Sequence, residues 1–209
     1  RTRQPVLNEI LLRFPKTLKL AVLALATAVI IGIPIGMLSA VKQYSRLDVI
    51  STTTALFVAA IPTFWMGLLL MLLFSLYLGW LPPGGSDSLL HYIMPTITLS
   101  LPMASSLLRL TRTAMLEVIS QDYVRTARSK GVKELFVICI HGFKNASLPI
   151  VTSLGMSFGS LLGGTVIIES IFSMPGLGTL MINAIRTTDI PQVMGSVLFL
   201  SALFCLVML

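Results

Sequence analysis

Few side chains in this sequence have the type and the spacing that chemistry would require. Glu169 is an isolated acid in an apolar segment, which makes it a candidate functional group unless it is hydrated or pairs with Arg186. His91 and His141 have no cysteine or carboxylate nearby at the spacing of metal ligands, so we expect no metal site. The sequence contains neither HExxH nor the phosphate-binding patterns GxxxxGKS and GxxxxGKT. We therefore predict a protein without catalytic residues.

The composition indicates a membrane protein. Apolar residues make up 55% of the 209 residues and charged residues 11%, whereas a soluble domain has about 25% charged residues. Several uncharged runs reach the ~20 residues that a helix needs to cross a bilayer. The net charge of +7 is interpreted as membrane topology, so we expect no nucleic-acid partner. The predicted fold class is an all-α bundle of membrane-spanning helices surrounded by lipid.

The apolar runs predict about five spans within a single transmembrane domain, 1–209, taken as a fragment of a longer chain. Pro5 and Pro15 should separate a short amphipathic helix, Asn8–Phe14, from the first span. Pro34 should bend the first span and Pro62 should kink the second. The expected spans are Leu20–Val41, Val49 to about Leu78, His91–Leu108, Ala146–Ile168 and Ile190–Leu209.

The longest polar interval, Asp122–Pro149, carries five of the cations and should lie on the inner face, where positive charge accumulates. Ser120 is the expected N-cap of a surface helix that ends near Lys130, with Gly131 in the left-handed terminating conformation. We define 119–149 as a cytoplasmic loop. It either binds a partner protein or is an ordinary basic loop that fixes the topology.

Two other patterns concern the spans themselves. The third span carries Thr96, Ser100 and Ser105, which either line a polar path or bond back to their own helix. Glycines at every fourth position of the fourth span predict close helix packing. These glycines are Gly155, Gly159 and Gly163.

Three motifs resemble the permease subunits of ABC importers, and cover nearly the whole chain. DYVRTARSKG followed by NASLP is similar to the cytoplasmic EAA loop of the dipeptide, oligopeptide and nickel branch. Arg125–Ala127 stand at the name-giving triplet, of which only the second alanine is kept. GTVIIESIFSMPGLG at Gly164–Gly178 resembles the ETxFSxPGxG segment, with Met174 in place of the common tryptophan, and IPTFW is the third match.

The resemblance implies a type I importer permease in the bacterial inner membrane, with a coupling helix that docks on a cytoplasmic ATPase. The chain itself would need no cofactor, because partner ATPases would bind ATP and magnesium. The other implied partners are a second homologous permease and an extracytoplasmic substrate-binding protein. The expected coupling residues are Asp122, Tyr123, Arg125, Thr126, Ala127, Arg128, Ser129, Lys130 and Gly131. The expected path and outer-gate residues are Thr96, Ser100, Ser105, Glu169, Phe172, Met174 and Pro175.

The substrate stays open between nickel, or a nickel chelate, and di- or oligopeptides, with the nickel B subunits the most similar in NASLPIVTSLGM and GGTVIIESIF. The alternative function is a self-sufficient secondary transporter or a channel. Such proteins favour charges within their spans, whereas these spans contain almost none. An intramembrane enzyme would need a nucleophile with its base, paired acids or HExxH, and none of these patterns is present.

Overall fold

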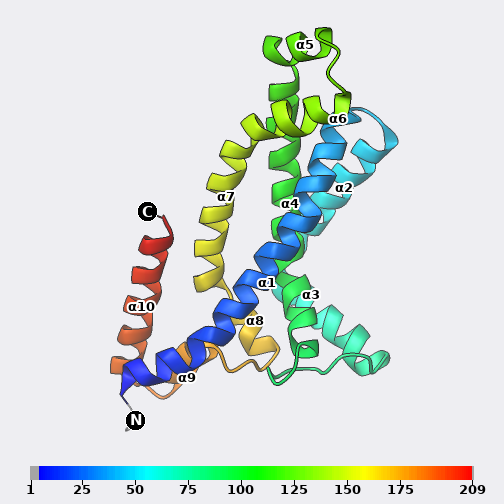
Figure 1. The fold of residues 1–209 in the computed structure, drawn as a ribbon. Helices are drawn as coiled ribbons and strands as arrows, with labels where there is room; N and C mark the ends of the chain where they lie inside the picture. The colour runs from blue at the N-terminus through cyan, green and yellow to red at the C-terminus, as the bar shows by residue number, and fades with distance from the viewer. Residues whose placement is uncertain (1–4, 209) are drawn as a thin grey trace. The chain divides into compact units, whose positions relative to one another are not determined.

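The structure is a computed structural model that describes residues 5–208, and every regular element in that range is helical (Figure 1). The elements in chain order are α1 (Val6–Val41), α2 (Arg46–Ala60), α3 (Thr63–Leu70), the π-helical η1 (Met71–Tyr77), α4 (Leu90–Ile119), α5 (Asp122–Ser129), α6 (Glu134–Phe136), the π-helical η2 (Val137–Gly142), α7 (Phe143–Gly164), α8 (Val166–Ile171), α9 (Leu177–Arg186) and α10 (Ile190–Met208).

Four helical segments of the described chain are long and apolar enough to cross a membrane. A fifth candidate consists of two helices that are separated by a short break. The expected all-α class with about five spans is thereby confirmed. The segments are Val6–Val41, Leu90–Ile119, Glu134–Gly163 and Ile190–Met208, together with the broken pair Arg46–Ala60 and Thr63–Tyr77.

The first helix does not break where its prolines suggested. The sequence predicted a separate short helix before the first span, but α1 is continuous through Pro15 and Pro34. Proline removes one backbone hydrogen bond and strains the preceding turn. Ile10 and Leu20, which lie on either side of Pro15, are only 2% and 0% exposed. Packing on both sides of the proline therefore keeps the helix intact, because tertiary contacts dominate helix stability.

The second span is interrupted at Pro62, where only a kink was expected. Helix α2 ends at Ala60 and α3 begins at Thr63, with Pro62 as its N-cap in an extended conformation. A proline disfavours the helical conformation of the residue that precedes it, here Ile61. Proline is also favourable just at the start of a helix, because its missing N–H would be unpaired there anyway.

Two later helices extend beyond their predicted ends. Helix α4 continues through Arg112 to Ile119, because buried Ala114 and Met115 prolong its apolar face. The fourth span was expected to begin at Ala146, but α6, η2 and α7 form one helical segment from Glu134 to Gly163. Pro149 lies inside α7. Residues 134–149 of the predicted cytoplasmic loop are therefore helical, and the bounds 119–149 of that loop stay a prediction.

Contacts divide the described chain into two compact units, and α1, α4 and α7 contribute to both. The first unit contains residues 5–26, 61–100 and 155–208, and its core includes Ile10, Leu177 and Leu180. The second unit contains residues 27–60 and 101–154. Its cores are formed by Ala28, Ala104, Leu107 and Ile150, by Ala40, Ala114, Met115 and Ala146, and by Val124, Ala127 and Val137. The single-domain assignment of 1–209 stays a prediction.

Glycines allow close backbone contact inside the second unit. A Cβ atom added to Gly32 would lie 2.7 Å from the carbonyl oxygen of Ala104, and one added to Gly36 would lie 2.6 Å from that of Leu108. Both contacts are with backbone atoms of α4, which cannot rotate away as a side chain would. The close approach of α1 to α4 therefore requires glycine at these positions.

The three glycines of α7 behave differently from one another. A Cβ atom at Gly159 would lie 2.8 Å from the ring of Phe204 on α10, so this glycine packs within the first unit. A Cβ atom at Gly155 or Gly163 would meet no atom of the described chain within 4 Å. The packing role of these two glycines therefore stays a prediction for contacts with other chains.

We predict that Gly36→Ala destabilises the protein and that Gly155→Ala does not. The added methyl group at position 36 must displace the α4 backbone, and overpacking of this kind costs about 1–3 kcal/mol. Position 155 has open space for the same group. The midpoint of thermal unfolding of the detergent-purified permease measures both effects. Equal midpoints for Gly36→Ala and the wild type would show that α1 and α4 are not tightly packed.

Candidate functional site

The expected surface helix is α5, Asp122–Ser129. Its C-terminal end was predicted correctly, whereas its N-cap was not. The N-cap is Gln121, because the hydroxyl of Ser120 instead donates to the carbonyl oxygen of Glu117 at 2.8 Å. Gly131 follows the helix with φ of +76°, which confirms the left-handed terminating conformation. A side chain at that position would be strained, so glycine gives the helix a defined end.

One side of α5 packs against its own chain. Val124 and Ala127 are 0% and 9% exposed and form a core with Val137, against which Val118 also packs. Ala127 was also expected among the ATPase-coupling residues. Its side chain faces this core, and its part in coupling stays a prediction. The remaining expected coupling residues are all exposed, namely Asp122, Tyr123, Arg125, Thr126, Arg128, Ser129, Lys130 and Gly131.

Two polar contacts brace α5 against the helical segment that follows it. The guanidinium of Arg128 binds the carboxylate of Glu134 in a bidentate pair, with N–O distances of 3.1 and 2.7 Å. The side-chain amide of Asn145 donates to the hydroxyl of Tyr123 at 3.0 Å. These contacts are exposed and individually weak. Together with the two buried side chains, they give α5 a defined orientation, so it can act as a rigid element.

A buried ion pair, which the sequence analysis missed, joins three helices in the second unit. Asp48 is 3% exposed and accepts hydrogen bonds at 2.6 and 2.8 Å from Nε and Nη2 of Arg112. The Ser39 hydroxyl also donates to Asp48, as does the Tyr44 backbone N–H at 2.9 Å. The sequence offered only a weak signal for this pair, namely an acid just before the second apolar run and a base shortly after the third.

The acid joins elements that meet near the start of α5. Ser39 lies in α1, Asp48 in α2 and Arg112 in α4, and α4 ends at Ile119, shortly before α5 begins. Tyr44 has φ of +63°, an unfavourable conformation for a residue with a side chain. Its backbone hydrogen bond to Asp48 helps to hold this turn. The carboxylate of Asp48 therefore organises the link between α1 and α2 as well as the contact with α4.

We predict that Asp48→Asn strongly destabilises the second unit. Removing one partner of a buried ion pair leaves the other charge unpaired, which costs about 3–5 kcal/mol. Arg112→Lys should have a smaller effect, because lysine keeps the charge but loses the bidentate geometry. The yield of folded permease after membrane extraction, with its thermal midpoint, measures both. Wild-type values for Asp48→Asn would contradict the assigned role.

Glu169 forms a second buried polar cluster, in the first unit. The side chain is 1% exposed and accepts hydrogen bonds from Thr17 at 2.6 Å and Thr165 at 3.2 Å. The backbone N–H groups of Gly178 and Thr179 donate to its other oxygen at 2.7 and 3.2 Å. Burial raises the pKa of the carboxyl group, and these hydrogen bonds oppose that effect. The residue thereby joins α1, α8 and α9.

The proposed alternatives for Glu169, hydration or pairing with Arg186, are both wrong. The carboxylate is enclosed by the PGLG segment, whose glycines fit closely around it. A Cβ atom at Gly176 would lie 2.4 Å from the carboxylate, and one at Gly178 would lie 2.5 Å from the backbone of Val166. Gly176 and Gly178 are therefore required, because the Glu169 carboxylate and α8 leave no room for a side chain at either position.

Two of the three residues expected to line a path form hydrogen bonds within their own helix. The hydroxyl groups of Ser100 and Ser105 donate to the carbonyl oxygens of Ile97 and Leu101, as the back-bonding alternative proposed. The Thr96 hydroxyl is buried and has no hydrogen-bond partner within the described chain. The role of these residues in a translocation path stays a prediction.

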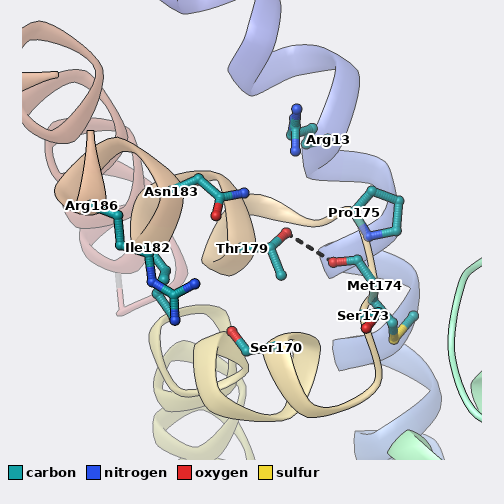
Figure 2. A pocket seen from close by; sticks show the side chains of 9 residues that line it. All are labelled: Arg13, Ser170, Ser173, Met174, Pro175, Thr179, Ile182, Asn183 and Arg186. Carbon is teal, nitrogen blue, oxygen red and sulfur yellow. Dashed lines mark hydrogen bonds between the residues drawn. The ribbon is translucent and has the colours of Figure 1, made fainter. Parts of the chain in front are cut away.

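The expected outer-gate residues lie around the Glu169 cluster. Phe172 and Met174 are each 1% exposed. The carbonyl oxygen of Phe172 accepts a hydrogen bond from Gly85 at 2.9 Å, so the turn after α8 is tied to the loop before α4. Met174 and the half-buried Pro175 line a polar cavity (Figure 2). Their role as a gate stays a prediction.

We predict that Glu169→Ala disrupts the turn between α8 and α9, whereas Glu169→Gln preserves most of it. Alanine leaves buried donors without an acceptor, at about 1–3 kcal/mol for each. Glutamine keeps one acceptor oxygen at nearly the same position. Limited proteolysis of membrane vesicles within residues 173–178 reports the order of this turn. Equal cleavage of the alanine variant and the wild type would argue against the role of Glu169.

Comparison with known proteins identifies the class of membrane protein. The family model for the inner membrane component of binding-protein-dependent transport systems matches residues 32–209. The chain belongs to this family. The glutathione transport system permease protein GsiC of Pectobacterium atrosepticum is 44% identical over 206 residues, which cover 99% of this chain and 67% of that protein. GsiC of Escherichia coli strain K12 is 42% identical over the same shares.

A solved structure supports the fold. A chain of the MetNI methionine ABC transporter in an inward-facing conformation has a TM-score of 0.80 and 16% sequence identity, over 99% of this chain and 94% of that chain. The likeness confirms the type I importer permease fold that the motifs predicted. The family also confirms the inner-membrane location. The chain is accordingly a permease subunit of an ABC importer and not an ATPase.

Proposed function

We propose that this permease imports a short peptide of the glutathione kind. The support is the identity of 42–44% with glutathione permeases over 99% of the chain. Glutathione is a small peptide, so this substrate falls within the peptide class that the sequence suggested. The nickel alternative has no comparable support among these relatives.

The import of such a peptide needs several further subunits. We propose a second homologous permease, a pair of cytoplasmic ATPases that bind ATP and magnesium, and an extracytoplasmic binding protein that delivers the peptide. The ATPases would supply the differential binding energy that shifts the permease between conformations. In this arrangement the chain contributes half of the translocation path.

The coupling element in this proposal is α5. A lever between two proteins must be held firmly on one side and exposed on the other. Val124 and Ala127 provide the buried side, while Arg125 and its exposed neighbours provide a cationic surface. The observation that carries this proposal is the braced, surface-exposed position of a short helix at the motif that resembles the EAA loop.

Arg125 gives a cleaner test of coupling than Arg128, since charge reversal of Arg128 would also break its pair with Glu134. We predict that Arg125→Glu abolishes ATP-driven uptake of labelled glutathione while leaving insertion and folding intact. The matched control is Lys144→Glu, which reverses an exposed charge at the start of α7, outside α5. This control should transport like the wild type.

The measurement uses the complete transporter in proteoliposomes with its binding protein. Co-purification of the ATPases should fall with Arg125→Glu and stay unchanged with Lys144→Glu. Normal uptake by Arg125→Glu would refute the docking role of α5. Glutathione flux through this permease alone, without ATPases, would instead support the alternative of a secondary transporter or channel.

A further inference from the structure

A groove in the first unit is lined by charged, polar and apolar side chains. It consists of two cavities of about 350 and 310 Å³, which share Arg13 and Asn183 as lining residues. Ligand sites in proteins begin at about 300 Å³. The first cavity is also lined by Ser173 and Arg186 (Figure 2). The second is also lined by two acids, Glu9 and Asp189. The predicted topology places residues 169–191 on the outer side, where a substrate arrives.

Two cations face this groove from different helices. Arg13 belongs to α1, whereas Arg186 and Asn183 belong to α9 on the opposite wall (Figure 2). Arg186 is exposed and forms no ion pair with any residue between 5 and 208. A guanidinium group can bind both oxygens of a carboxylate, and such bonds are stronger than those between neutral groups.

Arg13 is only loosely engaged by its own chain. It pairs with Glu9 one turn earlier at 3.4 Å, and the two side chains are 30% and 18% exposed. Pairs of this kind on a helix contribute only about 0.3–0.5 kcal/mol. A ligand carboxylate can therefore compete for Arg13. Glu9 would then remain beside the second cavity as a partner for a positively charged group.

The nearby acid Glu169 forms no ion pair with Arg13 or Arg186. Its carboxylate is not among the groups that line either cavity. It is enclosed by Thr17, Thr165 and the backbone N–H groups of the PGLG segment. The first cavity consequently presents two guanidinium groups, an amide and hydroxyl groups, without a lining acid. This chemistry suits an anion that carries hydrogen-bond acceptors.

We propose that this groove is a binding site for the free carboxylate of a short peptide within the permease itself, with Arg186 and Arg13 as the carboxylate-binding residues and Glu9 near the peptide's amino group. The proposal rests on the peptide substrate proposed above. It gives the permease a direct part in substrate recognition, in addition to the part played by a binding protein. The cavities are large enough for a di- or tripeptide that enters from the outer side.

The test measures equilibrium binding of labelled glutathione to the complete transporter in nanodiscs, without binding protein or ATP. The wild type should bind saturably, and Arg186→Gln or Arg13→Gln should weaken binding roughly tenfold or more. Lys16→Gln is the matched control, since it removes the same charge from α1 at a position that lines neither cavity. It should bind like the wild type. Glutathione with both carboxylates esterified should bind as weakly as the arginine variants.

Each other outcome overturns the proposal. Absence of saturable binding to the wild type, or unchanged binding by Arg186→Gln, would exclude a carboxylate site. Equal losses with Lys16→Gln would show general attraction of anions. Unchanged peptide binding with weakened affinity for the binding protein would mean that the cations face that protein instead.

A parallel uptake assay separates this inference from the proposed function. It uses the complete wild-type transporter with its binding protein and ATP. If the transporter takes up glutathione but the binding assay finds no site in the groove, only the present inference is refuted. Failure to import glutathione or any other short peptide would defeat the proposed substrate class.

Discussion

A chain that lies largely in lipid must satisfy its buried polar groups from within, because the surroundings offer no hydrogen bonds. Helices meet this requirement for the backbone, and every regular element of residues 5–208 is a helix. Buried carboxylates are the most difficult groups to satisfy, because they carry a charge as well as unpaired acceptors. Asp48 and Glu169 are 3% and 1% exposed, and each is surrounded by several donors. Much of the internal organisation of the two units follows from these two acids.

The two acids are stabilised by different means. Asp48 is matched by the full charge of Arg112, in a bidentate geometry that suits a buried ion pair. Glu169 is surrounded by neutral hydroxyl and backbone donors, and burial raises its pKa. An ion pair holds helices in one arrangement, whereas backbone donors hold a turn. The first cluster accordingly joins the ends of α1, α2 and α4, and the second shapes the segment between α8 and α9.

This division agrees with the work of an importer permease. The element proposed to receive force, α5, is short and braced, with two apolar side chains buried beneath an exposed cationic surface. Residues 169–191, which lie on the substrate side in the predicted topology, instead contribute Asn183 and Arg186 to the lining of two cavities. In the proposed function, the rigid contacts of α5 would transmit movement, and the accessible donors of these cavities would bind the substrate.

The sequence by itself determined the membrane class, the approximate spans, the basic loop and the family, because hydropathy, charge and short motifs are local properties. It also placed Gly131 correctly, since a left-handed helix end depends on one residue. Two of its local predictions were wrong. Pro15 does not end α1, because residues on both sides of it are buried in the packing of the first unit. Ser120 does not cap α5, because its hydroxyl donates to the carbonyl oxygen of Glu117 instead.

Only the tertiary structure decided which distant residues satisfy the buried acids. Thr17 and Glu169 are 152 positions apart, and Asp48 and Arg112 are 64 apart. No periodicity in the sequence encodes such pairs, because they depend on which helix faces meet. The groove between Arg13 and Arg186 has the same origin, since its opposite walls come from α1 and α9. The physical reason is that packing, rather than sequence distance, determines which polar groups share an environment from which water is excluded.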